Sequence, residues 1–316
     1  MKFKDIIISF TFLILGCGGS YESNRDEIIK EIERDEIIKE IESGFVSVGS
    51  GGIILTSFDG NSWISRTSGT SSQLKAVTYG ENMFVAVGDS GTILTSSLGK
   101  SWTSRTSGTS IELNEVTFGG NTFVAVGKSG TILTSSDGTS WTSRTSGTAR
   151  ELNGVTYGGN TFVVVGISGT ILTSSDGTSW TSRTSGTPQP LRGVTYGGST
   201  FVTAIDSGKF LTSTNGGISW VSTSSGTSDQ IIEIIYGGGT FVAVGQPGII
   251  QTSSDGTSWT SRTSGTTQYL DGVTYGGNTF VAVGWGSIIL TSSDGTTWIS
   301  RTSGTTQNLL DISYKD

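Results

Sequence analysis

Residues 113–146 read Leu113-Asn-Glu-Val-Thr-Phe118, Gly-Gly-Asn-Thr, Phe123-Val-Ala-Val-Gly127, Lys-Ser-Gly, Thr131-Ile-Leu-Thr-Ser135, Ser-Asp-Gly-Thr-Ser and Trp141-Thr-Ser-Arg-Thr-Ser146. Four short runs in this stretch are rich in β-branched and aromatic residues, and Gly, Asn, Asp and Ser separate them. None of the runs has the length or the 3.6-residue period of a helix. The stretch therefore predicts four short strands joined by tight turns.

The same unit recurs along the chain, and one tryptophan marks each copy. Successive marker tryptophans are 39 or 40 residues apart, and they are Trp63, Trp102, Trp141, Trp180, Trp220, Trp259 and Trp298. Four short strands in a unit of about 40 residues are typical of a β-propeller blade. The spacing therefore predicts a ring of such blades.

The two ends of the repeat region are complementary. The first copy begins at Phe45 with a second strand, and residues 309–314 match a first strand with nothing after it. Pairing of these ends completes one blade and removes the exposed sheet edges of an open array. We therefore predict an all-β chain over residues 44–316, a seven-bladed β-propeller of four-stranded antiparallel blades closed by its N- and C-terminal strands.

Residues 1–17 have the features of an export signal. Lys2 and Lys4 precede an apolar run from Ile6 to Leu15, which is too short to span a bilayer. The sequence Ile14-Leu15-Gly16-Cys17 resembles a bacterial lipobox, in which the cysteine becomes the acylated first residue of the mature protein. We expect Cys17 to be lipidated; a plain signal peptide with an incidental cysteine is the alternative.

Residues 18–43 predict a charged, partly helical tether between this anchor and the propeller. A nonapeptide is duplicated over 25–33 and 34–42. Nine residues make two and a half helical turns, so the isoleucine clusters of the two copies point in opposite directions. No continuous apolar stripe results, which argues against a coiled coil or a membrane-surface helix. With Gly18 after the cysteine, we expect an outer-membrane lipoprotein of a bacterial envelope, periplasmic or surface-exposed.

The composition limits the possible chemistry. The 316 residues carry a net charge of −7, with no histidine and one cysteine. A mildly acidic chain has no electrostatic footprint for nucleic acid. Imidazole bases, cysteine nucleophiles in the propeller and Cys/His zinc sites are excluded. We expect no cofactor, no metal and no nucleic-acid partner, and a monomer bound to the membrane through its lipid.

The turn before each marker tryptophan resembles the Asp-box of sialidase-type propellers, as in Ser135-Ser-Asp137-Gly-Thr-Ser140-Trp141. The resemblance extends to the photosystem II stability and assembly factor family, and it implies the fold more than an activity. Leu98 and Asn215 replace the acid in two copies, so we interpret the acids as turn-stabilising groups. They are Asp59, Asp137, Asp176, Asp255 and Asp294.

The arginines three residues after the tryptophans lie on the outermost strands, so we expect a solvent-facing or inter-blade ladder there.

Differences between copies concentrate in two loop types, which an up-and-down blade places on one face. These are the triplet before each first strand and the turn between the second and third strands; we call their side the variable face, and the opposite side the uniform face. Trp285 is the only tryptophan outside the repeat pattern, and exposed aromatic residues are favoured binding anchors. The predicted ligand-binding residues are Trp285, Asp89, Lys128, Asp206, Gln246, Arg192 and Tyr269.

These differences permit more than one function. We expect a non-enzymatic binding or assembly module for a protein or glycan; neutral drift in exposed loops would give the same pattern. Packing of Trp285 onto its own blade competes with a binding role for that residue. A sialidase-like or other glycoside hydrolase is the alternative function. Its carboxylate pair could come from acids outside the repeat pattern, namely Asp89, Asp206, Glu115, Glu233 and Asp271.

Overall fold

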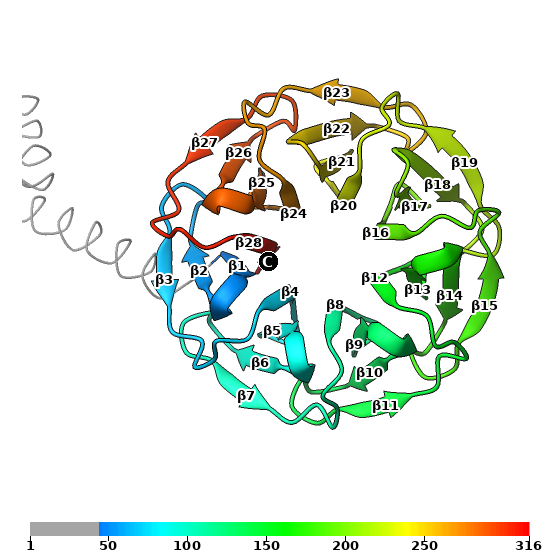
Figure 1. Ribbon diagram of the computed structural model, residues 1–316, viewed down its shortest axis with the longest axis horizontal. Coiled ribbons are helices and arrows are strands. Elements are labelled where there is room, and N and C mark those ends of the chain that lie inside the picture. The colour runs from blue at the N-terminus through cyan, green and yellow to red at the C-terminus, as the bar shows by residue number, and fades with distance from the viewer. Residues whose placement is uncertain (1–43, 316) are drawn as a thin grey trace, which may run out of the picture. The chain divides into compact units, whose positions relative to one another are not determined.

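The computed structural model describes residues 44–315, and these form seven four-stranded antiparallel sheets around a central axis (Figure 1). The expected signal peptide, Cys17 and the expected tether lie outside the described residues. The sheets are separate blades, so the fold is the predicted seven-bladed β-propeller.

Each blade runs from the centre of the ring to its rim in chain order, apart from the closing blade. The innermost strands line the centre in Figure 1, and they are β4 (Leu74–Gly80), β8 (Leu113–Gly119), β12 (Leu152–Gly158), β16 (Leu191–Gly197), β20 (Ile231–Gly237), β24 (Leu270–Gly276) and β28 (Leu309–Tyr314). The second strands are β5 (Met83–Gly88), β9 (Thr122–Gly127), β13 (Thr161–Gly166), β17 (Thr200–Ile205), β21 (Thr240–Gly245), β25 (Thr279–Gly284) and β1 (Phe45–Gly49).

The third and fourth strands complete the blades toward the rim. The third strands are β6 (Ile93–Ser96), β10 (Ile132–Ser135), β14 (Thr170–Ser174), β18 (Lys209–Ser213), β22 (Ile249–Ser253), β26 (Ile289–Ser292) and β2 (Ile54–Ser57). The rim strands are β7 (Thr103–Arg105), β11 (Thr142–Arg144), β15 (Thr181–Thr184), β19 (Val221–Ser224), β23 (Thr260–Arg262), β27 (Ile299–Arg301) and β3 (Ile64–Arg66). Single 3₁₀ turns join five second–third strand pairs, namely η1 (Ser50–Gly52), η2 (Asp89–Gly91), η3 (Lys128–Gly130), η4 (Ile167–Gly169) and η5 (Trp285–Ser287).

The two ends of the described chain close the ring. β28 pairs antiparallel with β1, with Phe45 opposite Tyr314 and Gly49 opposite Leu309. The Ser47 hydroxyl also donates to the main-chain oxygen of Asp311 at 2.9 Å. The predicted closure is therefore confirmed, and the closing sheet has the order β28-β1-β2-β3.

The hydrophobic core lies between blades. In one of seven such clusters, Val85 and Ile93 of one blade pack against Phe123 and Leu133 of the next, all at most 1% exposed. Trp141 packs against the same cluster from its half-buried position. Because every strand is short and both sheet faces are covered by neighbouring blades, burial between blades provides the main stabilisation.

A glycine at the end of six of the seven inner strands sets how closely blades approach. A Cβ added to Gly158 would lie 2.1 Å from Cγ of Tyr196 in the next blade. The same relationship joins Gly119 to Tyr157. An aromatic ring therefore occupies the space of the missing side chain, and the repeat requires glycine at this position.

Candidate functional site

The acids before the marker tryptophans stabilise their own turns. Oδ1 of Asp137 accepts the main-chain N–H groups of Thr139 and Ser140, both at 2.8 Å. The Trp141 indole N–H donates to the Gly138 carbonyl at 3.0 Å, which covers the turn. Hydrogen bonds, led by that from Ser140, hold the pKa of Asp137 well below its usual range. Asn215 provides the same acceptor to Ser219 N–H at 3.0 Å, as the turn interpretation requires.

The arginines of the rim strands do not converge on the centre. In each case the Nε–H donates to a threonine hydroxyl of the third strand in the same blade, as from Arg144 to Thr134 at 2.8 Å. The equivalent pairs are Arg66–Thr56, Arg105–Thr95, Arg183–Thr173, Arg262–Thr252 and Arg301–Thr291. Each bond stays within one blade, so these arginines do not form an inter-blade ladder, which was the alternative to a solvent-facing one. The threonine lies two residues along the third strand from the position opposite the arginine.

The two variable loop types meet on one face. The first residue of each second–third turn donates its main-chain N–H to the last residue of the triplet before the inner strand. The pairs are Ser50–Asn308, Asp89–Gln73, Lys128–Glu112, Ile167–Glu151, Asp206–Pro190, Gln246–Gln230 and Trp285–Tyr269, with N···O distances of 2.9–3.1 Å. The variable face is thus a ring of seven joined loop pairs around the mouth of the central channel.

Two of the predicted residues belong to a charge network on this face. Glu112 forms ion pairs with Lys75 and with Lys128, the latter at 2.7 Å. Asp89 lies 4.0 Å from the Lys75 ammonium group. Burial raises the pKa of Glu112, but the hydrogen bonds from Lys128 and Lys75 outweigh it and the net shift is downward. Sequence reasoning missed Lys75 and Glu112, which join neighbouring blades here.

A second ion pair lies at the channel mouth, within one blade. Arg192 binds the Asp206 carboxylate through two nitrogens, at 3.3 and 3.1 Å. The Gln230 amide donates to the same carboxylate. Burial raises the pKa of Asp206, and the hydrogen bonds from Arg192 and Gln230 lower it further than burial raises it. Gln246 lies in the adjacent turn, and its main-chain N–H bonds to Gln230.

The off-pattern tryptophan is both packed and exposed. Its ring centroid lies 4.9 Å from that of Tyr269, at an interplanar angle of 50°. The Trp285 side chain lies near the Asp271 carboxylate, whose pKa it lowers against the larger opposing effect of burial. Nevertheless 43% of Trp285 remains exposed. Trp285 therefore packs onto its own blade and is exposed to solvent at the same time.

Three carboxylates lie deeper in the channel, at one register position of three inner strands. They are Glu115, Glu233 and Asp311, and the equivalent residues in the other four blades are Ala76, Gly154, Gly193 and Gly272. Burial raises the pKa of all three, and their mutual repulsion raises that of Glu115 further. Alignment of the first strands would have revealed Asp311, which sequence reasoning missed.

Each of these carboxylates is held by main-chain groups. The N–H of Val116 donates to Glu115 and that of Ile234 to Glu233, both at 2.9 Å. Asp311 accepts the N–H of Val77 in the next blade at 2.7 Å. Two connected cavities share the three acids, one of about 160 Å³ within the channel and one of about 280 Å³ at its mouth on the variable face.

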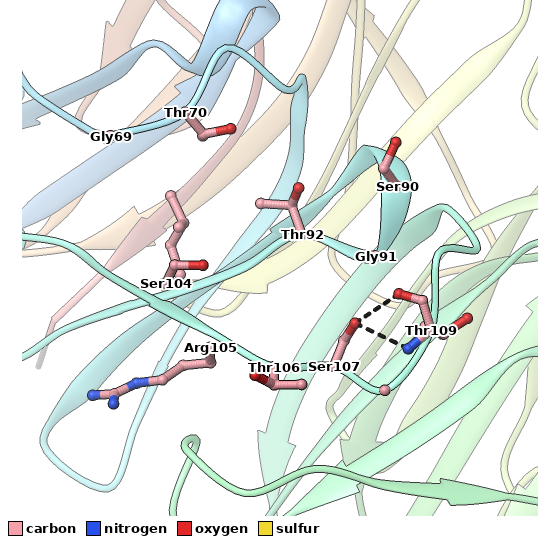
Figure 2. A pocket seen from close by; sticks show the side chains of 12 residues that line it. Gly69, Thr70, Ser90, Gly91, Thr92, Ser104, Arg105, Thr106, Ser107 and Thr109 are labelled. Carbon is pink, nitrogen blue, oxygen red and sulfur yellow. Dashed lines mark hydrogen bonds between the residues drawn. The ribbon is translucent and has the colours of Figure 1, made fainter.

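Other grooves lie near the rim and are built from residues common to the repeats. Figure 2 shows one of about 530 Å³, in which the Ser107 hydroxyl bonds to both the N–H and the carbonyl of Thr109. The same serine–threonine bond recurs in every blade, for example between Ser146 and Thr148. These grooves follow from the repeat itself and do not distinguish one blade from another.

Two further findings concern metals and membranes. Within residues 44–315, no group of three or more His, Cys, Asp or Glu side chains is arranged to hold a metal ion. No helix in the same part of the chain has both the length and the apolar character needed to cross a membrane.

The chain is similar to solved β-propellers. A structure of YCF48 bound to D1 peptide is 19% identical, with a TM-score of 0.59 over 73% of this chain and 81% of that one. YCF48 from Cyanidioschyzon merolae is also 19% identical, with a TM-score of 0.58 over 72% and 84%. The computationally designed Ika8 protein is 13% identical, with a TM-score of 0.62 over 87% and 92%. No family model matches the sequence, and no curated protein matches it. At these identities the likeness shows the shared propeller fold.

Proposed function

We propose that this protein is a lipid-anchored binding or assembly module of a bacterial envelope, and that it holds its partner on the variable face. The observation that carries the proposal is the joining of all seven variable loop pairs around one channel mouth, with Trp285 exposed beside Tyr269. Propeller ligands are commonly held at such concave mouths, where aromatic anchors are surrounded by polar groups. One YCF48 propeller is described with a bound D1 peptide, so this architecture accommodates a protein ligand.

Site-specific photo-crosslinking tests the choice of face. A benzophenone side chain replaces Lys128, which is exposed on the variable face, and in a second variant replaces Ser136, which is exposed in a turn of the uniform face. We expect ultraviolet light to link a partner to the Lys128 variant, and mass spectrometry to identify it as a protein or a glycan conjugate. Adducts formed only through position 136 would contradict the proposal.

Glycoside hydrolysis is the second candidate, because the channel acids include groups suited to the role of general acid. Glu115 and Glu233 share a cavity with Asp311, and the pKa of each is raised by burial, as a general acid requires. Incubation with a panel of chromogenic glycosides tests this function directly. Turnover that the Glu115→Gln and Glu233→Gln variants both lose would favour the hydrolase over the binding module.

A further inference from the structure

The channel mouth is lined by more acidic than basic residues. Its lining includes five acids and two bases, namely Glu115, Glu151, Glu233, Asp271 and Asp311 against Lys75 and Arg192. Both bases already have partners outside this lining, since Lys75 pairs with Glu112 and Arg192 with Asp206. Neither base therefore balances the acids that face the cavity.

The deepest acids lack a positive partner. Within residues 44–315, neither lysine nor arginine forms an ion pair with Glu115, Glu233 or Asp311. Repulsion among these carboxyl groups disfavours their ionised form, and a cation that reaches them favours it. The cavity is thus electrostatically complementary to a positively charged group.

An aromatic pair stands at the edge of the same cavity. Trp285 lies near Asp271, which lines the mouth, and its ring packs against Tyr269. Aromatic faces attract ammonium and guanidinium groups, most strongly where the contact is shielded from water. The aromatic rings are a separate feature from the three deeper acids, and they favour the same charge on the ligand.

Glycines at two of the equivalent positions let the neighbouring inner strands approach the acids closely. A Cβ on Gly193 would lie 2.7 Å from Oε1 of Glu233, and one on Gly272 would lie 2.7 Å from Cα of Asp311. Because the mouth cavity and the inner cavity share the three acids, a long unbranched side chain can reach them from outside. Lysine and arginine combine such an apolar stem with a charged end.

We propose that the partner is a protein with a basic segment, and that one lysine or arginine side chain of this segment enters the channel mouth. Its stem lies against Trp285 and Tyr269, and its charged end lies among Asp271, Glu233 and Asp311. This inference rests on the proposed function of the variable face and identifies the chemistry of the ligand there.

A titration with acetyl-hexalysine amide tests the proposal, with the indole ¹⁵N–¹H signal of Trp285 as the readout. We expect a saturable shift of this signal, no shift with acetyl-hexaglutamate amide, and affinity for hexalysine weakened about tenfold or more by Glu233→Gln combined with Asp311→Asn. Glu81→Gln is the matched control for the loss of one charge, since Glu81 is exposed on the uniform face. It should leave the affinity within about twofold of wild type.

Melting temperatures of all variants show whether the fold is retained. No shift of the Trp285 signal with hexalysine, or equal affinity in wild type and the double variant, would overturn the basic-ligand proposal. A shift produced by cellohexaose but not by hexalysine would also overturn it, in favour of a glycan. In these cases crosslinks from position 128 would still support the variable face, so failure of the inference remains distinct from failure of the proposed function.

Discussion

The ring of Phe45 in β1 lies 4.7 Å from the ring of Tyr314 in β28, at an interplanar angle of 56°. Between them the two strands form the seam that closes the propeller. Deletion of residues 309–316 would remove the buried side chains of Leu309 and Ile312 and expose the edge of β1. We expect loss of at least about 3 kcal/mol of unfolding free energy, or aggregation, measured by urea denaturation.

Removal of Asp316 alone is the control for that deletion. It leaves β28 and its pairing with β1 intact. A chain without residues 309–316 that melts at the wild-type temperature would show that closure contributes little.

Replacement by alanine should destabilise the fold at a marker tryptophan but not at the off-pattern Trp285. Trp141→Ala removes a side chain that packs between blades and covers its turn, so we expect a loss of about 2–4 kcal/mol of unfolding free energy. Trp285→Ala should change it by about 0.5 kcal/mol or less, because the side chain lies on the variable face and is 43% exposed. Affinity for the crosslinked partner should fall about thirtyfold with Trp285→Ala, as for an interface anchor. Unfolding of the Trp285 variant would make this residue a packing element instead.

Glycine at the blade contact should not tolerate alanine. A Cβ at Gly158 would lie 2.1 Å from Tyr196, so Gly158→Ala forces two blades apart and should cost about 1–3 kcal/mol, seen as a fall in melting temperature. Gly147→Ala serves for comparison, since Gly147 has φ +77° and nothing within 4 Å of an added Cβ. It should cost about 1 kcal/mol from backbone strain alone. Equal losses in the two variants would show that the Tyr196 ring moves aside freely.

The channel acids should make the protein less stable at alkaline pH. Burial raises the pKa of Glu233 and Asp311, and burial raises the pKa of Asp271 to about 6 against the opposing effect of Trp285. At pH values between the ordinary carboxyl pKa and these raised pKa values, the acids are protonated in the folded chain but ionised in the unfolded chain. Stability is greatest below the usual carboxyl pKa for these groups and falls as pH rises through the folded pKa.

Melting temperature measured from about pH 5 to about pH 9 checks this dependence. Glu233→Gln combined with Asp311→Asn should flatten the decline, because the amides do not titrate. The turn acids act oppositely: hydrogen bonds lower the pKa of Asp137, so its contribution is lost as pH falls below the usual carboxyl range. An unchanged decline in the double variant would place its origin elsewhere.

Acylation at Cys17 is the prediction for the N-terminal segment. Replacement of Cys17 by Ser should move the protein from the membrane to the soluble fraction, because a lipid chain provides its hydrophobic attachment. Cell fractionation and the mass of the intact mature protein measure the change. Wild-type fractionation of the variant, with no lipid mass lost, would show that the cysteine is not the anchor.

The repeat made the architecture predictable from sequence. The regular tryptophan spacing gave the number of blades, and the unmatched ends at Phe45 and Tyr314 gave the closure, because both are properties of chain order. The role of Asp137 was also predictable, since a short carboxylate in a turn readily accepts the main-chain N–H group two residues later.

The contents of the channel were harder to foresee. Glu115 and Glu233 were recognised as departures from the repeat, but their approach to Asp311 depends on strands far apart in sequence. The arginine bonds were not predicted, for a related reason. The alternation of side chains along a strand predicts which face of the sheet Arg144 lies on, but not its hydrogen-bond partner. The strand register places Ile132 opposite Arg144 and leaves Thr134 within hydrogen-bond reach.

The closing blade also dictates an order of events in folding. Ser47 and Asp311 bond across 264 residues of chain, whereas the other six blades each come from one continuous segment. Those six can form locally while the seventh must wait for its last strand, and such long-range pairing slows folding. We therefore expect the ring to stay open until the six-residue strand β28 has been synthesised, and resistance to proteolysis to appear only after that strand pairs with β1.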